Sequence, residues 1–272
     1  MSSLALGKAL GRDAGAHLAP GEATGLLLQR NFLAYRSAWW VFVSGFLEPV
    51  FYLFSIGVGV GQLVTGFAFN GQVIPYAEFV APGMLAASAM NGAILDATFG
   101  IFFKLKYDKI YDGVLATPMR SIDIATGELA WSLMRSATYS GGFLVVMWAM
   151  GLVHSWWGVL AWPATWLIGL AFGGAGMALT TYMRSWQDFE FIQLAIVPMF
   201  LFSATFFPLS AFPTALQWVV ELTPLYRGVV LCRELTVGAV GVGSLVSVVY
   251  LAAMGAVGLL VAARRFDKLL LH

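Results

Sequence analysis

The sequence predicts an all-α polytopic membrane protein with six transmembrane helices. Three observations predict this fold class: an apolar composition, six apolar segments of spanning length, and an uneven distribution of basic residues. Of the 272 residues, 60% are hydrophobic and 11% are charged, whereas a soluble domain has roughly 45–50% and about 25%. The mean hydropathy is +0.81. Such a chain is expected to place most of its surface against lipid or against its own helices.

The apolar segments define the predicted spans. A membrane helix needs roughly 20 mostly apolar residues, and the segments that satisfy this are 39–64, 76–103, 122–153, 159–182, 189–207 and 242–263. Residues 1–24 lack an apolar core long enough for a signal peptide and are rich in Gly, Ala and Pro. We expect them to form a flexible cytosolic leader, followed by a single transmembrane domain over residues 25–272.

The basic residues set the orientation, because Lys and Arg near the ends of spans are retained on the cytoplasmic side. With the N-terminus inside, 13 of the 15 basic residues fall on inner segments, Arg135 among them, and only Arg227 and Arg233 fall outside. This split predicts cytoplasmic N- and C-termini.

The first predicted cytoplasmic loop, KLKYDKIYDGVLATPMRS (104–121), is the most charged stretch of the chain. Its apolar side chains have the spacing of one helix face: Tyr107, Ile110, Tyr111, Val114 and Leu115. Pro118 is incompatible with continuing that helix. The loop is therefore predicted to hold a two-to-three-turn amphipathic helix. Such a helix either docks on a cytosolic partner or lies passively on the lipid surface.

Motifs for catalysis or nucleotide binding are absent from the sequence. It has no G-x-x-x-x-G-K-[ST] phosphate loop, its three histidines are dispersed, and its single cysteine is Cys232. The net charge of +1 gives no attraction to nucleic acid. The polar residues within spans are Glu48, Asn91 and Asp96. Carboxylates in a membrane usually face protein or a water-filled path, so Glu48 and Asp96 have either a structural or a transport role.

The predicted outer region between spans five and six contains two apolar segments, 211–222 and 225–235, that are too short to span. They are predicted to be helices that dip into the outer leaflet where protein covers their ends.

Several segments together resemble one family. These are GFLEPVFYLFSIGVGVG (45–61), PYAEFVAPGMLAASAM (75–90), LATPMRSIDIATGEL (115–129), and LFSATFFPLSAFP with LTPLYRGVVLCREL (201–235). Their order and spacing resemble the ABC type-2 exporter permeases, most closely the branch of the nodulation-factor and daunorubicin-resistance export permeases.

The resemblance implies a six-span permease subunit in a bacterial cytoplasmic membrane. It implies an N-terminal interfacial helix near 25–37, a coupling helix near 107–116 that docks on a separate ATPase, and short outer helices near 211–235. Two permease subunits, as a homodimer or with a sister permease, would enclose the path, and two ATPase copies would hold ATP and Mg. This chain would bind no cofactor of its own.

The sequence therefore predicts an exporter subunit for an amphiphilic cargo, which is a glycolipid, a lipo-oligosaccharide or a hydrophobic drug. Spans one, two and five would line the path, and the candidate positions are Glu48, Asn91, Asp96, Met199 and Phe206. One alternative is a self-sufficient secondary transporter in which Glu48 and Asp96 carry protons. A membrane enzyme is disfavoured because the sequence shows no nucleophile and base pair.

Overall fold

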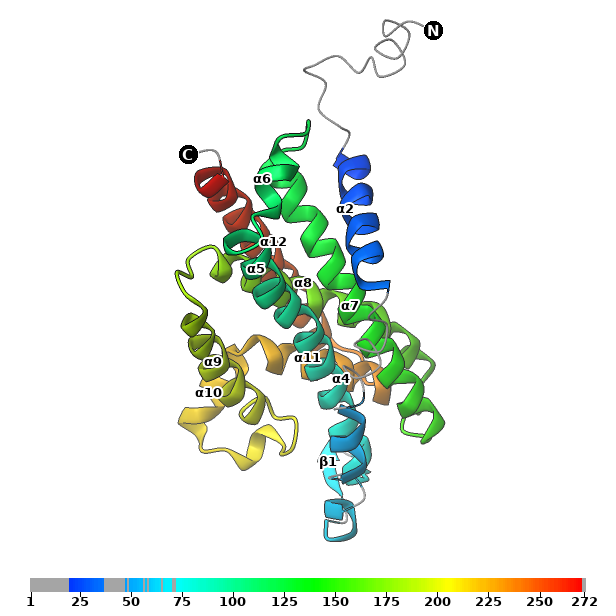
Figure 1. The fold of residues 1–272 in the computed structure, drawn as a ribbon. Helices are drawn as coiled ribbons and strands as arrows, with labels where there is room; N and C mark the ends of the chain where they lie inside the picture. The colour runs from blue at the N-terminus through cyan, green and yellow to red at the C-terminus, as the bar shows by residue number, and fades with distance from the viewer. Residues whose placement is uncertain are drawn as a thin grey trace, which may run out of the picture.

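The computed structural model describes residues 20–36, 47, 49–55, 57, 59–64, 66–69 and 72–270, which form a mainly helical bundle (Figure 1). The principal helices are α2 (Pro20–Tyr35), α4 (Tyr76–Leu95), α5 (Ile101–Lys106), α6 (Ile110–Leu115), α7 (Ser121–Ala149), α8 (Ala161–Thr180), α9 (Phe189–Leu201), α10 (Thr214–Leu222), α11 (Pro224–Val237) and α12 (Val242–Leu270). The short 3₁₀ turns are η2 (Val60–Gln62), η4 (Trp156–Leu160), η5 (Trp186–Asp188) and η6 (Leu209–Ala211).

Three of the described helices are long and apolar enough to cross a membrane: Tyr76–Lys106, Trp156–Thr180 and Val242–Leu270. They coincide with the predicted second, fourth and sixth spans. Helix α7 has 29 residues and covers residues 122–149 of the predicted third span, but it is more polar than these three. The first part of the predicted first span, residues 39–46, lies outside the described residues.

The predicted fifth span, 189–207, is helical only as far as Leu201. At about 1.5 Å per residue, the 13 residues of α9 extend roughly 20 Å. Beyond it, Ala204 has a positive φ of 54°, and the buried Ser203 hydroxyl donates to the Phe200 carbonyl oxygen at 2.8 Å. This irregular backbone is therefore covered and hydrogen-bonded by protein, as chain at membrane depth must be.

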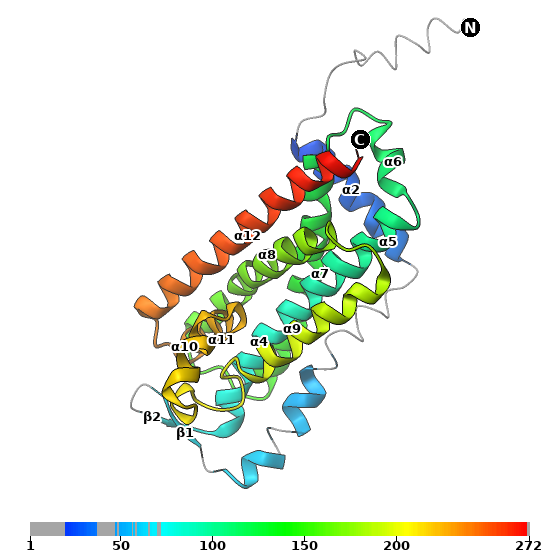
Figure 2. The ribbon, with the colours of Figure 1, turned by 90° about the vertical axis from the view of Figure 1, so that its left-hand side faces the viewer.

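The two ends of the bundle differ in what they hold. Helix α2, helix α6 and the C-terminal end of α12 lie together at one end, which we call the terminal end (Figures 1 and 2). The opposite end holds α10 and a small antiparallel hairpin of β1 (Phe67–Phe69) and β2 (Gln72–Ile74), in which Phe67 pairs with Ile74. This hairpin was not predicted from the sequence.

Proline and glycine fix several helix ends. Helix α11 begins with Pro224 at its first position, where a missing N–H costs nothing. It ends at Gly238, which adopts the left-handed conformation typical of a helix C-cap (φ 86°). The two predicted outer helices are thus present as α10 and α11.

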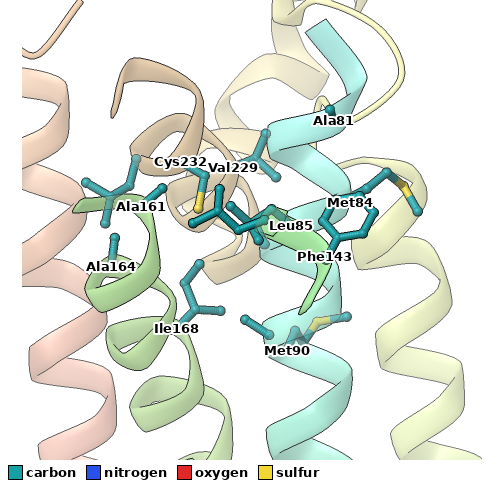
Figure 3. Close-up of a cluster of buried hydrophobic side chains, with 14 of the residues drawn as sticks. Ala81, Met84, Leu85, Met90, Phe143, Ala161, Ala164, Ile168, Val229 and Cys232 are labelled. Carbon is teal, nitrogen blue, oxygen red and sulfur yellow. The ribbon is translucent and has the colours of Figure 1, made fainter. Parts of the chain in front are cut away.

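The core centres on α8, which packs against α4, α7, α11 and α12. Met84, Leu85, Phe143 and Ile168 meet in this core, and Val229 of α11 closes it (Figure 3). Helix α11 is therefore an integral part of the bundle.

Helices α8 and α12 approach until their backbones touch. A methyl group added at Gly174 of α8 would lie 2.7 Å from the carbonyl oxygen of Gly255 in α12, and Gly258 is equally confined. Small residues at such a seam allow close helix contact, which drives association in a membrane. We call these three residues the glycine seam.

Helix α7 joins its neighbours through hydroxyl groups. Ser132 and Ser136 each donate to a carbonyl oxygen of α4, that of Ala93 and of Ala89 respectively, both at 2.8 Å. Interhelical hydrogen bonds of this kind link helices in lipid, where apolar burial contributes little. The moderate polarity of α7 therefore supports its packing.

Candidate functional site

The larger of two neighbouring cavities runs along α4 and has a volume of about 710 Å³. Its walls come from the helical residues 49–52, from α4, from α9 and from the loop after α9. The lining residues are Pro49, Tyr52, Val60, Tyr76, Met84, Ala87, Met90, Asn91, Ile94, Leu95, Gln193, Ile196, Val197, Phe200, Leu201, Phe206 and Phe207. Most are aliphatic or aromatic, so we call this space the apolar cavity.

Two of the predicted path residues, Asn91 and Phe206, line the apolar cavity. Met199 instead packs, half buried, against the core. Glu48 lies outside the described residues, although the next residue, Pro49, is at the cavity wall. Spans two and five therefore meet at one apolar surface.

Asp96 lies below that surface, in a π-helical turn (Asp96–Gly100) that joins α4 to α5. Its Oδ1 atom is 2.7 Å from Nη1 of Arg135, and the Arg135 guanidinium also donates to the Tyr139 hydroxyl at 2.8 Å. Arg135 lies well inside α7, so assigning it to a cytoplasmic flank was wrong. Its charge is balanced in place by Asp96 instead of marking a loop.

A second cavity of about 460 Å³ surrounds this ion pair, and we call it the polar cavity. Its lining residues are Tyr35, Leu95, Asp96, Phe99, Gly100, Phe103, Lys104, Asp108, Ile110 and Arg135. Leu95 lines both cavities. The two spaces therefore follow one another along α4 and α5 toward the terminal end.

A buried ionic cluster next to the polar cavity was missed by the sequence analysis. Glu128 of α7, 2% exposed, accepts from Arg30 at 2.8 Å, from Lys104 at 2.7 Å and from Asn31 at 3.2 Å. The sequence feature that could have revealed it is the acidic residue Glu128 within the predicted third span, where an unpaired charge is costly. The cluster ties α2 and α5 to α7.

Helix α2 lies against α7 through a stripe of Ala23, Leu27 and Asn31. Leu27 fits onto Gly127, where any added side chain would collide with it. Phe32 and Leu33 remain exposed. The N-terminal helix near 25–37 is thus present.

The predicted amphipathic helix is shorter than expected and faces inward. Tyr107 belongs to a turn in which Lys109 has a positive φ of 48°, and α6 itself covers Ile110–Leu115. Tyr111 is fully buried against Phe266 of α12, with ring centroids 5.9 Å apart. Burial, and then the negative charge of Glu128, raise the pKa of the Tyr111 hydroxyl well above 10.

Four residues of this segment are exposed, Tyr107, Asp108, Lys109 and Asp112, and Asp108 also lines the polar cavity. Ile110, Val114 and Leu115 are half buried. A partner would therefore meet a mixed polar surface with one exposed aromatic ring, and would not touch Tyr111.

Near the opposite end, Arg233 of α11 joins α4 to the loop after α9. Its guanidinium donates to the carbonyl oxygens of Phe79, at 3.1 and 3.2 Å, and of Ala204, at 2.9 Å. It also lies 3.8 Å from the centre of the Phe79 ring, which favours a cation. Desolvation lowers the pKa of Arg233 to about 10. Arg233 therefore holds the irregular loop that precedes Phe206.

Among the described residues, no group of three His, Cys, Asp or Glu side chains could hold a metal ion. What the described chain offers is two linked cavities, an inward-packed helix α6 and a charged surface at the terminal end.

Comparisons with known proteins agree with this arrangement. Residues 22–237 match the ABC-2 type transporter family. The chain is 33% identical over 215 residues to "Nodulation protein J" of Rhizobium leguminosarum bv. viciae, covering 77% of this chain and 80% of that protein. It is 32% identical over 216 residues to the protein of the same name from Rhizobium meliloti (78% and 80%). It is also 34% identical over 210 residues to the Sinorhizobium fredii protein (75% and 78%).

The match extends from α2 through α11, and so includes both cavities, α6 and the outer helices. Proteins of this family are membrane subunits of transporters, and the associated ATPase activity lies on a partner. The chain therefore belongs to the ABC-2 type transporter family, as the membrane-embedded permease of an ABC exporter.

Proposed function

We propose that this permease exports an amphiphilic molecule, such as a glycolipid, a lipo-oligosaccharide or a hydrophobic drug, across a bacterial cytoplasmic membrane. The apolar cavity carries the proposal. It offers about 710 Å³ between α4, α9 and residues 49–52, and sites for small molecules are typically apolar with a few polar groups. Here Asn91 and Gln193 are among those polar groups.

In this proposal two permease copies face each other and two copies of a cytosolic ATPase supply ATP and Mg. The terminal end lies in the cytosol, so that the exposed side of the 107–112 segment reaches the ATPase. Coupling then passes from that surface to Tyr111 and the helices around it.

The proton-coupled alternative is weakened by the position of Asp96. A proton carrier must alternate between charged and neutral forms, and in Asp96 each cycle would break the 2.7 Å ion pair with Arg135 and leave the buried guanidinium without its carboxylate.

Reconstitution tests the proposal. Proteoliposomes containing the chain alone should neither hydrolyse ATP nor move a fluorescent lipo-oligosaccharide. Adding a partner ABC ATPase should produce both activities together. ATP hydrolysis by the purified chain, or transport driven by a proton gradient without ATP, would contradict it.

A further inference from the structure

Glu128 of α7 lies at the junction of α2, α5 and α7. Its carboxylate, 2% exposed, accepts hydrogen bonds from Arg30 and Asn31 of α2 and from Lys104 of α5. The side-chain oxygen of Asn31 also accepts from Arg30 at 3.0 Å and from Lys104 at 3.3 Å. We call these four residues the Glu128 cluster. Each of its members has more than one partner, which fixes the three helices relative to one another.

Helix α5 is connected to the rest of the chain in two different ways. On one side it continues from α4 through the π-helical turn Asp96–Gly100, and on the other side it leads directly into segment 107–112. A π-helical turn interrupts the regular α-helical hydrogen bonds, and such turns are frequent at functional sites. Because α5 has only six residues, a movement of segment 107–112 would bend the chain at this turn unless α5 is also held elsewhere.

The ion pair of Lys104 with Glu128 provides that second attachment. Nζ of Lys104 lies 2.7 Å from Oε2 of Glu128, and only 13% of the lysine side chain is exposed. Arg30, the other cation of the cluster, is 32% exposed. Buried ion pairs are screened less than exposed ones, so the lysine pair is expected to hold more firmly. It joins α5 to α7 beyond the π-helical turn.

Helix α6 reaches the same part of α7 through apolar packing. Tyr111 is fully buried and belongs to one hydrophobic cluster with Ala125 and Leu129 of α7, which lie on either side of Glu128 in the sequence. The elements before and after the exposed turn at Tyr107 are therefore attached to the same stretch of α7, α5 by charge and α6 by packing.

We propose that Glu128 is a positioning residue in transport: through Lys104 it makes α5 and α7 move together, so that a movement of segment 107–112 reaches α7. The inference deepens the proposed function and rests on it, because this movement is the one that a bound ATPase would impose. Arg30 and Asn31 attach α2 to the same carboxylate. Since α2 contributes no residue to segment 107–112, these two contacts are expected to stabilise the protein without transmitting the movement.

Two substitutions separate these roles, because each removes one cation from Glu128. Lys104→Met releases α5 and leaves Glu128 paired with Arg30, whereas Arg30→Met releases α2 and leaves Glu128 paired with Lys104. A buried charge is most costly when its partner is lost altogether, and in both variants the carboxylate keeps one cation. Both proteins are therefore expected to fold, with similar unfolding transitions.

Reconstitution with a partner ABC ATPase provides the functional comparison. Lys104→Met should keep the ATPase bound and lower the transport of the fluorescent lipo-oligosaccharide per ATP hydrolysed by about tenfold, the size of effect found for substitutions in coupling networks. Arg30→Met and the conservative Lys104→Arg should keep the ratio of the unmodified protein. A purely structural role would change the amount of folded protein and not this ratio. Equal ratios in Lys104→Met and Arg30→Met would overturn the proposal.

A distance measurement tests the same linkage without any cargo. Spin labels are attached at Lys106→Cys of α5 and Thr138→Cys of α7, both of which are exposed positions, while the native Cys232 is buried. The distance is compared between the nucleotide-free complex and the complex trapped with ATP and vanadate. It should stay constant when Lys104 is present and change in Lys104→Met. A change when Lys104 is present, or a constant distance in Lys104→Met, would contradict the linkage.

The two measurements separate this inference from the proposed function. A complex that hydrolyses ATP and shows the expected distances but exports no lipo-oligosaccharide would refute the proposed function alone. Export combined with a constant distance in Lys104→Met would refute the role of Glu128 alone.

Discussion

At the scale of single residues, the charged side chain of Asp96 is balanced by an oppositely charged side chain on another helix, that of Arg135. Asp96 and Arg135 come from different helices, each nearly buried, with 5% and 11% of their side chains exposed. Each would be costly alone at membrane depth. The pair therefore has a clear structural role, one of the two that the sequence left open for Asp96.

A double-mutant cycle measures this role. Asp96→Asn should lower the stability of the detergent-solubilised protein by about 3 kcal/mol, because it leaves the Arg135 guanidinium buried without its carboxylate. Asp96→Asn combined with Arg135→Gln should recover most of that loss, since no buried charge then remains uncompensated. Unfolding followed by tryptophan fluorescence provides the measurement.

The proton-carrier reading predicts a different pattern. In that case Asp96→Asn would unfold like the unmodified protein and would lose only the pH dependence of transport.

At the scale of elements, α6 shows what an amphipathic pattern can and cannot predict. The spacing correctly indicated a helix with one apolar face. However, periodicity does not say what covers that face, and here Tyr111 is covered by Phe266 of the same chain. The positive φ of Lys109 separates Tyr107 from the helix, which the spacing also did not reveal.

Because Tyr111 is buried and Asp112 is exposed, substitutions at these two positions should affect stability and ATPase binding separately. Tyr111→Ala should destabilise the permease by about 3–5 kcal/mol, the usual cost of emptying a buried aromatic site, as measured by its unfolding transition. Asp112→Lys, on the exposed side of α6, should leave that transition unchanged and reduce co-purification of the ATPase.

Glu221→Lys is the matched control, because Glu221 lies in α10 toward the opposite end. If Tyr111→Ala released the ATPase from a permease of normal stability, the docking surface would include the inward face after all.

At the scale of the whole molecule, the sequence predicted helices best where a long apolar segment is enough to determine that a helix forms. The helical stretch Tyr76–Lys106 and helix α12 agree with the predicted segments, because a long apolar run has few other stable forms in lipid. The π-helical turn at Asp96 and the cluster around Glu128 depend on residues far apart in the chain, so local pattern could not reveal them. The same holds for the cavities: Asn91 and Phe206 line the apolar cavity and Asp96 lines the polar cavity, and their role in transport stays a prediction.

Orientation in the membrane stays a prediction, and cysteine labelling of intact cells can test it. Ser155→Cys and Thr214→Cys should react with an impermeant maleimide, whereas Lys109→Cys and Arg184→Cys should react only after permeabilisation. Cys232 should give little background, because it is fully buried and desolvation raises the pKa of its thiol to about 12, leaving little reactive thiolate. Labelling at position 109 in intact cells would contradict the predicted topology, because that position would then lie outside the cell.

The glycine seam between α8 and α12 has a mechanical consequence. Backbones already in contact at Gly174, Gly255 and Gly258 can neither approach further nor slide without steric collision. These two helices should therefore move as one rigid wall. Helix α9 meets the bundle through fewer side chains, such as Ile192 and Ile196, and exposes Phe191 and the rest of its outer face. Widening of the path during a transport cycle is then expected on the α9 side, with α8 and α12 as the fixed frame against which it opens.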